Sequence, residues 1–164
     1  MLAHELAEPY PYVSTDDAAT DAALLLAEHK LPALLVVDGD DQPYAVVPGS
    51  QLVGRLVPEC PLQDPPPAAG FDDRDLDEVP DRLVGLTVAM GVPPLERSRE
   101  WGRLPRHRFR PSTVEPDASV LHIAALMART HTPLVTVVER DGDQTWLVGA
   151  VTAASLMERL IGGT

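Results

Sequence analysis

The chain has 164 residues, of which 45% are apolar, so it is long enough for one compact domain or two small ones. Its formal net charge of −12 argues against general binding to nucleic acid or to an anionic membrane. The single cysteine, Cys60, allows no disulfide framework, and the N-terminus lacks the pattern of a signal peptide, so we expect a cytoplasmic protein. No apolar run approaches the roughly 20 residues that cross a bilayer, so we expect no membrane insertion.

The first third of the chain predicts one unit of alternating helices and strands. Its expected elements are the helix 18–30, the strand 33–37, the turn 38–41, the strand 44–47 and the closing helix 50–56. Apolar residues in the first helix recur at i, i+3, i+4 and i+7, which is the spacing of one buried face. Pro32 ends this helix, and the run ALLVV that follows is typical of a strand buried on both faces.

The same order of elements returns near the C-terminus, with Val114 in the place of Val13. Its expected elements are the helix 119–131, the strand 134–138, the turn 140–143, the strand 146–151 and the closing helix 154–160. The two opening helices align without a gap, and the second copy is three residues longer at the hairpin, where insertions are tolerated. The repeat predicts two related units that bury a shared core around a pseudo-twofold axis.

The predicted domain boundaries follow from the repeat and from the composition between its copies. The expected parts are a first repeat with an N-terminal lead-in (1–57), a proline-rich and acidic linker (58–81), and a second repeat with a lead-in strand and an arginine-rich loop (82–164). The lead-in strand is expected at 86–92, and the lead-in 1–12 is expected to pack beside the partner repeat. Residues 97–110 hold six of the 13 basic residues of the chain and are either a solvated loop or an anion contact.

The ordered motifs resemble the CBS-domain family (cystathionine β-synthase domains), whose members usually occur as pairs. The motifs are VEPDASVLHIAALM (114–127), TPLVTVVE (132–139) and LVGAVTAASLME (147–158), with a worn first copy, VSTDDAATDAALLLAEHKLPALLVVD (13–38). The resemblance implies an α+β fold, a tandem pair of CBS repeats packed with pseudo-twofold symmetry. Each repeat would be β-α-β-β-α, a small three-stranded sheet with two helices.

In that family a repeat can offer a cleft for an adenosine-type ligand, and a motif G-h-h-T-x-x-D supplies a threonine at a helix start and an aspartate for the ribose. Gly149 to Thr152 keeps the first half of the motif, whereas Ser155 stands at the aspartate position. The first copy has Pro48 and Gln51 instead, so a ligand is expected in the second-repeat cleft. The implied contacts are Thr113, Val114, Thr132, Pro133, Leu134, Thr152 and Ser155, with a phosphate contact from Arg108 and Arg110. The alternative is that Thr152 and Ser155 only cap a helix.

Patterns typical of enzymes are missing from the sequence. The five histidines show no metal-ligand spacing, and there is no GxGxxG, P-loop or nucleophile elbow. Cys60 lies in the proline-rich linker, where a reactive role has no support. We therefore expect no catalytic residues, no metal and no cofactor other than a regulatory ligand such as AMP, ADP, ATP or S-adenosylmethionine.

The resemblance leaves two functions open. The first is a non-catalytic regulatory module that binds an adenine nucleotide or related adenosyl ligand and modulates a partner protein. The alternative is a ligand-free dimerisation or interaction module that docks on a separately encoded transporter, channel or enzyme. Thr152 and the arginine segment favour the first, and the missing aspartate favours the second. The resemblance also implies a flat homodimer formed through exposed helices, with 156–161 as a candidate surface.

Overall fold

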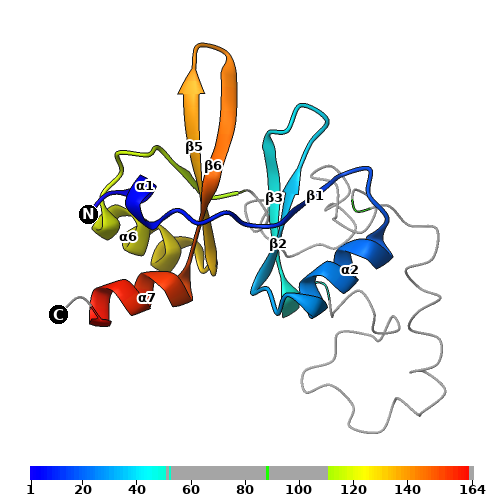
Figure 1. Cartoon of the computed structure of the whole chain (residues 1–164), viewed down its shortest axis with the longest axis horizontal. Helices are drawn as coiled ribbons and strands as arrows, with labels where there is room; N and C mark the ends of the chain where they lie inside the picture. Colours follow the sequence, from blue (N-terminus) through cyan, green and yellow to red (C-terminus); the bar gives the residue numbers. More distant parts are fainter. Residues whose placement is uncertain (51, 53–87, 89–110, 163–164) are drawn as a thin grey trace, which may run out of the picture.

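The computed structural model of the protein describes residues 1–50, 52, 88 and 111–162. Its elements run α1 (Ala3–Leu6), β1 (Tyr12–Ser14), α2 (Ala19–Glu28), β2 (Ala33–Val37), β3 (Pro43–Pro48), β4 (Thr113–Val114), α6 (Val120–Thr130), β5 (Leu134–Asp141), β6 (Gln144–Thr152) and α7 (Ala153–Gly162). They form two three-stranded sheets, ordered β1-β2-β3 and β4-β5-β6 (Figure 1). The predicted α+β pair of repeats is confirmed. None of the described helices has the length and apolar character that a membrane crossing requires.

The two repeats share the same pairing and the same backbone turns. In each sheet the first strand is parallel to the second, and the second is antiparallel to the third. Lys30 (φ 49°) and His131 (φ 53°) both adopt the left-handed conformation just after the opening helix of their repeat. Asp41 (φ 58°) and Gly142 (φ 62°) do so at the hairpin turns. Both pairs keep the sequence offset that places Val114 over Val13, so the repeat extends to individual turn residues.

The second hairpin is the longer of the two. The β5–β6 ladder continues to the pair Asp141 and Gln144 over a two-residue turn, whereas β2 and β3 are joined by the longer loop 38–42. The predicted strand 33–37 matches β2, but the predicted strands of the second hairpin are shorter than β5 and β6. The three additional residues of the second copy therefore extend a strand ladder instead of enlarging a loop.

Between residues 50 and 111 the structure describes only Leu52 and Val88. Gly49, Ser50 and Leu52 have helical backbone where the closing helix 50–56 is predicted, and Leu52 packs against the first-repeat core. Val88 is also helical, is buried, and donates its N–H to the Asp17 carbonyl at 2.8 Å. The strand expected around it is absent at Val88, and β4 is the strand that leads into the second repeat. The predicted linker 58–81 and the arginine segment 97–110 lie outside the described residues.

The two sheets pack face to face and leave their outer faces to the helices. The residues between the sheets, here called the inter-sheet cluster, are Ala33, Leu35, Val46, Leu134 and Ala150. Leu35 and Leu134 are fully buried, so each repeat supplies part of the surface that buries the other. Because side chains alternate along a strand, the neighbours Leu34 and Val36 point the other way, into the core beneath α2.

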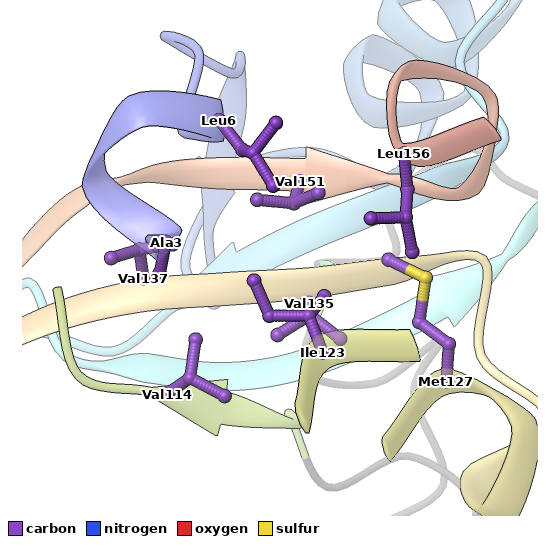
Figure 2. Close-up of a cluster of buried hydrophobic side chains, with 9 residues drawn as sticks. All are labelled: Ala3, Leu6, Val114, Ile123, Met127, Val135, Val137, Val151 and Leu156. Atoms are coloured by element: carbon purple, nitrogen blue, oxygen red, sulfur yellow. The ribbon is translucent and has the colours of Figure 1, made fainter. Parts of the chain in front are cut away.

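The outer face of the second sheet carries a core of its own, shown in Figure 2. Side chains from helices α1, α6 and α7 meet side chains from all three strands there. The members are Ala3, Leu6, Val114, Ile123, Met127, Val135, Val137, Val151 and Leu156. The spacing of Ile123 and Met127 places both on the inner face of α6, as the sequence predicts.

Residues 2–10, here called the N-terminal strap, connect the two sheets. Although the strap precedes the first repeat, α1 lies on the second, where Leu2 and Glu8 form β-bridges to Ser119 and Ala150. The chain then crosses to the first sheet (Figure 1), and the Tyr10 hydroxyl donates to the Ala33 carbonyl at 2.7 Å. The expectation that the lead-in packs beside the partner repeat is therefore confirmed, and the helical turn α1 was not predicted.

The strap also explains why a glycine stands at position 149. A Cβ atom there would lie 2.7 Å from the Glu8 carbonyl oxygen and 3.3 Å from the Ala7 Cβ, closer than ordinary contacts allow. Glu8 exchanges two backbone hydrogen bonds of 3.0 Å with Ala150, so it cannot move away without breaking them. This glycine of the LVGAVT motif is thus required by the close approach of two backbones.

We predict that Gly149→Ala destabilises the protein by about 1 to 3 kcal/mol, because the added methyl group forces the strap away from β6. Thermal unfolding measures the loss. Gly39→Ala is the matched control, since a Cβ at this turn position meets nothing within 4 Å. Equal effects of the two substitutions would show that the strap does not constrain position 149.

Burial raises the pKa of Tyr10 above its ordinary value of 10.0. Below pH 10 the phenol is neutral in both the folded and the unfolded chain, so its full contribution to stability is present. Above pH 10 the unfolded phenol ionises first, which lowers the free energy of unfolding. We predict that Tyr10→Phe costs about 1 kcal/mol at neutral pH, and that this cost shrinks as the pH rises above 10. Urea unfolding of both proteins across this range measures it, and a pH-independent difference would contradict the assignment.

Candidate ligand site at the end of the second sheet

The predicted site residues gather at one end of the second sheet. β5 begins there with Leu134, which pairs with Thr152 at the end of β6. On the other side of β5, Thr113 of β4 lies opposite Thr136. Thr113 and Thr152 therefore lie on opposite sides of β5, two strand spacings (roughly 10 Å) apart across the sheet and offset by two residues along it. The structure places the predicted residues along one rim and does not bring the two threonines into contact.

Thr152 and Ser155 form a reciprocal cap at the start of α7. The Ser155 N–H donates to Thr152 Oγ1 at 3.1 Å, and the Thr152 N–H donates to Ser155 Oγ at 3.1 Å. This is the geometry of a capping box, with serine in the place usually taken by glutamate or glutamine. Both side chains remain half-buried at the surface. The capping role is thus observed. Both hydroxyl groups stand at a helix N-terminus, where the helix dipole favours an anion, and they donate their own protons within the cap, Thr152 Oγ1 to Ser155 Oγ at 3.1 Å and Ser155 Oγ to the Thr152 carbonyl at 3.0 Å.

Val114 and Leu134 contribute to the rim through their backbones. The Val114 side chain belongs to the core beneath α6, and the Leu134 side chain belongs to the inter-sheet cluster. Both are buried, with 5% and 0% exposure, so a ligand could touch only their peptide groups. Thr132 and Pro133, which precede β5, are half-buried, and the Pro133 carbonyl accepts the Ala153 N–H at 2.9 Å.

Three hydroxyl residues at this rim were not predicted as part of the site. The Ser112 Oγ donates to Thr130 Oγ1 at 3.4 Å, and Thr130 Oγ1 lies 3.2 Å from Thr132 Oγ1. Thr136 is fully buried and donates to the Ser112 carbonyl at 3.2 Å. The recurrence of Ser and Thr at 112, 113, 130, 132 and 136 was the available signal. It is weak because α6 and β4 meet at this rim only in the folded chain.

The first repeat has the same local backbone but different chemistry. The Gly49 N–H donates to the Pro32 carbonyl at 3.1 Å, which repeats the bond between Ala153 and Pro133. Pro48 ends β3 where Thr152 ends β6, so the hydroxyl group is missing. Leu35 stands in the place of Thr136. The hydroxyl-lined rim is therefore a property of the second repeat. Gln51, Arg108 and Arg110 lie outside the described residues.

A separate hollow lies at the opposite end of the sheets, between the two hairpin turns. Its volume is about 810 Å³, and we call it the hairpin hollow. Its lining residues are Tyr12, Val37, Asp40, Asp41, Gln42, Asp143, Gln144, Thr145, Trp146 and Leu147. None of the predicted site residues lines it. Within the described part of the chain, no three His, Cys, Asp or Glu side chains are grouped as metal ligands.

Comparison with known proteins supports the repeat and the fold. The family model of the CBS domain matches residues 3–57 and 103–162. A CBS domain-containing protein of unknown function from Kribbella flavida is 36% identical to this chain, with a TM-score of 0.76 and coverage of 98% of this chain and 99% of the other. No curated protein matches the chain.

Two more distant structures were determined with nucleotides. CBSX2, a CBS-pair protein from Arabidopsis thaliana, in complex with AMP has a TM-score of 0.62 and 20% identity, and the match covers 98% of this chain and 96% of that one. The CBS domain of a bacterial CNNM/CorC family Mg²⁺ transporter in complex with ATP has a TM-score of 0.61 and 16% identity, with 99% and 88% covered. At these identities the likeness concerns the fold.

We predict that Thr152→Ala destabilises the protein by about 1 kcal/mol, because the Ser155 N–H loses its acceptor. Thermal unfolding measures the loss. Ser119→Ala is a matched loss of a helix cap, since Ser119 Oγ accepts the His122 N–H at the start of α6. Thr152→Ser keeps the hydroxyl and should retain most of the stability. A Thr152→Ala protein as stable as wild type would show that the cap contributes nothing.

Proposed function

This chain belongs to the CBS-domain family, and on that premise we propose that it is a non-catalytic regulatory module of the cytoplasm. It binds an adenine nucleotide or a related adenosyl ligand at the rim formed by Thr113, Thr132, Pro133, Thr152 and Ser155. Ligand binding then modulates a partner protein. AMP, ADP, ATP and S-adenosylmethionine are the candidate ligands.

The observation that carries this proposal is the position of Thr152. Its hydroxyl stands at the N-terminus of α7 and at the end of β6, beside the half-buried residues that precede β5. A helix N-terminus with a hydroxyl group is suited to phosphate oxygens, and peptide groups at the rim can pair with the edge of a base. The complexes of CBSX2 with AMP and of the CNNM/CorC CBS domain with ATP support an adenine nucleotide as the ligand class.

Ser155 determines how tightly the ribose can be held. A carboxylate at this position would accept from both ribose hydroxyls, whereas the Ser155 hydroxyl already accepts the Thr152 N–H and donates to the Thr152 carbonyl at 3.0 Å. The proposed ligand is therefore bound more weakly than by a cleft with aspartate there. An aspartate at this position, the third residue of α7, can accept the Thr152 N–H as Ser155 does, and its charge is favourable in the first turn of a helix, so the site can accept it without loss of the cap.

A second candidate function is a ligand-free interaction module. It is favoured by the missing carboxylate and by the outer surface of α7, where Met157, Leu160 and Ile161 are 54%, 48% and 72% exposed. Apolar side chains grouped on one helix are typical of a surface that another protein covers. In this case the chain would form a homodimer or dock on a separately encoded transporter, channel or enzyme without a nucleotide.

Thermal unfolding with each candidate ligand tests the proposal. A ligand at a hundred times its dissociation constant adds about 2.7 kcal/mol, which raises the melting temperature by several degrees in a domain of this size. We predict that one adenosyl compound gives such a shift, and that Thr152→Ala abolishes it. We also predict that Ser155→Asp enlarges the shift at equal ligand concentration.

Ser119→Ala again serves as the control, because it removes a cap of the same kind on α6 and should keep the ligand shift. If no compound shifts wild type or Ser155→Asp, the ligand proposal is wrong. Gel filtration with light scattering then tests the interaction module, which predicts a dimer of the wild-type protein that Ile161→Ser weakens. If the wild-type protein is a monomer, with the same molar mass as Ile161→Ser, the α7 surface is not a dimer contact.

A further inference from the structure

The hairpin hollow is bounded by both repeats and lies at the opposite end of the sheets from the hydroxyl-lined rim with Thr113 and Thr152. The loop 38–42 of the first repeat and residues 143–147 of the second face each other across it. The Gln42 Nε2 donates to the Thr145 carbonyl at 2.8 Å, so one hydrogen bond joins the two sides. Its volume of about 810 Å³ lies within the range of small-molecule sites in proteins, about 300 to 1,000 Å³.

Two aromatic rings line this hollow and remain open to solvent. Tyr12 is 52% exposed and Trp146 is 47% exposed, although aromatic residues are only 4% of the chain. Neither residue belongs to one of the buried hydrophobic clusters of the described residues, so neither ring is part of a core. An open aromatic face binds cations through the negative potential of the ring, and tryptophan does so most strongly.

The described residues that line the hollow carry charge of one sign only. Asp40, Asp41 and Asp143 are the charged residues among them, and Arg140 is paired with the lining residue Thr145 across the β5–β6 ladder. Among the described residues, none of these three carboxylates takes part in a salt bridge. The chain as a whole carries a formal charge of −12, which adds to the attraction for a cation at low ionic strength.

The first-repeat side of the hollow is held in shape before any ligand binds. Asp38 Oδ1 accepts the Asp40 N–H at 2.9 Å and the Gln42 N–H at 3.0 Å, and these bonds fix the loop. Asp41 adopts the left-handed conformation (φ 58°) in the same turn. Because these bonds order the backbone of the loop, a ligand would meet its side chains with little further ordering.

We propose that the hairpin hollow binds a small organic cation whose charge is carried on an ammonium group. The rings of Trp146 and Tyr12 contact the apolar groups around the nitrogen, and the carboxylates of Asp40, Asp41 and Asp143 neutralise its charge. Gln42 and Thr145 lie in the lining where they can pair with polar groups of the same ligand. Since the hollow spans both repeats, the cation links the two hairpins.

Choline and spermidine are suitable probes, with binding followed by calorimetry and by tryptophan fluorescence of the full chain at fixed ionic strength. We expect at least one of them to bind. We also expect the uncharged carbon isostere of choline, in which a tert-butyl group replaces trimethylammonium, not to bind. Trp146→Ala should weaken binding about tenfold, and Asp143→Asn should weaken it several-fold.

Glu28→Gln is the control for charge, because it removes one exposed carboxylate at the end of α2, outside the hollow. It should leave cation binding unchanged, and Thr152→Ala should do so as well, which separates this site from the nucleotide rim. The proposal is overturned if neither probe binds, if the isostere binds as tightly as choline, or if Glu28→Gln weakens binding as much as Asp143→Asn.

Discussion

The structure depends on the contact between the inner faces of two small sheets. Each sheet has only three strands, and neither could remove both of its faces from water with its own helices. Leu35 of one repeat and Leu134 of the other are completely buried in this contact, with Ala33, Val46 and Ala150 around them. The fold is therefore stable as a pair. The hydroxyl-lined rim and the hairpin hollow both follow from this contact, because the packed sheets leave the rim at one end and the hollow between the hairpin turns at the other.

The N-terminal strap turns this pair of similar repeats into an asymmetric molecule. It ties the second sheet to the first through Glu8 and Tyr10, and its passage over β6 requires the glycine at 149. The two repeats also differ in their strands. Pro48 and Leu35 of the first repeat occupy the positions that Thr152 and Thr136 occupy in the second. Hydroxyl groups thus concentrate in one repeat, and the proposed nucleotide site is single although the fold is duplicated.

The sequence predicted the elements whose conformation depends on neighbouring residues, such as buried strands between turn signals and the turns themselves. The run ALLVV between Pro32 and Asp38 predicts β2 to the residue, and Asp41 and Gly142 occupy the turn positions that need positive φ. The sequence did not predict the elements whose conformation depends on contacts with distant segments of the chain. The turn α1 exists because Ala3 and Leu6 are buried on the second repeat, and Val88 is helical in the core of the first. The hairpin hollow needs residues from three separate segments, so no pattern along the chain indicates it.

Hydrogen exchange of Leu35→Ala tests the central claim most directly, because this substitution removes a side chain of the first repeat from the inter-sheet cluster. A shared core predicts that the amides of β5 lose protection together with those of β2, although no residue of the second repeat is changed. Val36→Ala, which opens the core beneath α2 instead, should affect β5 less. Loss of protection confined to β1, β2 and β3 in Leu35→Ala would contradict the account and show that the repeats are stable independently.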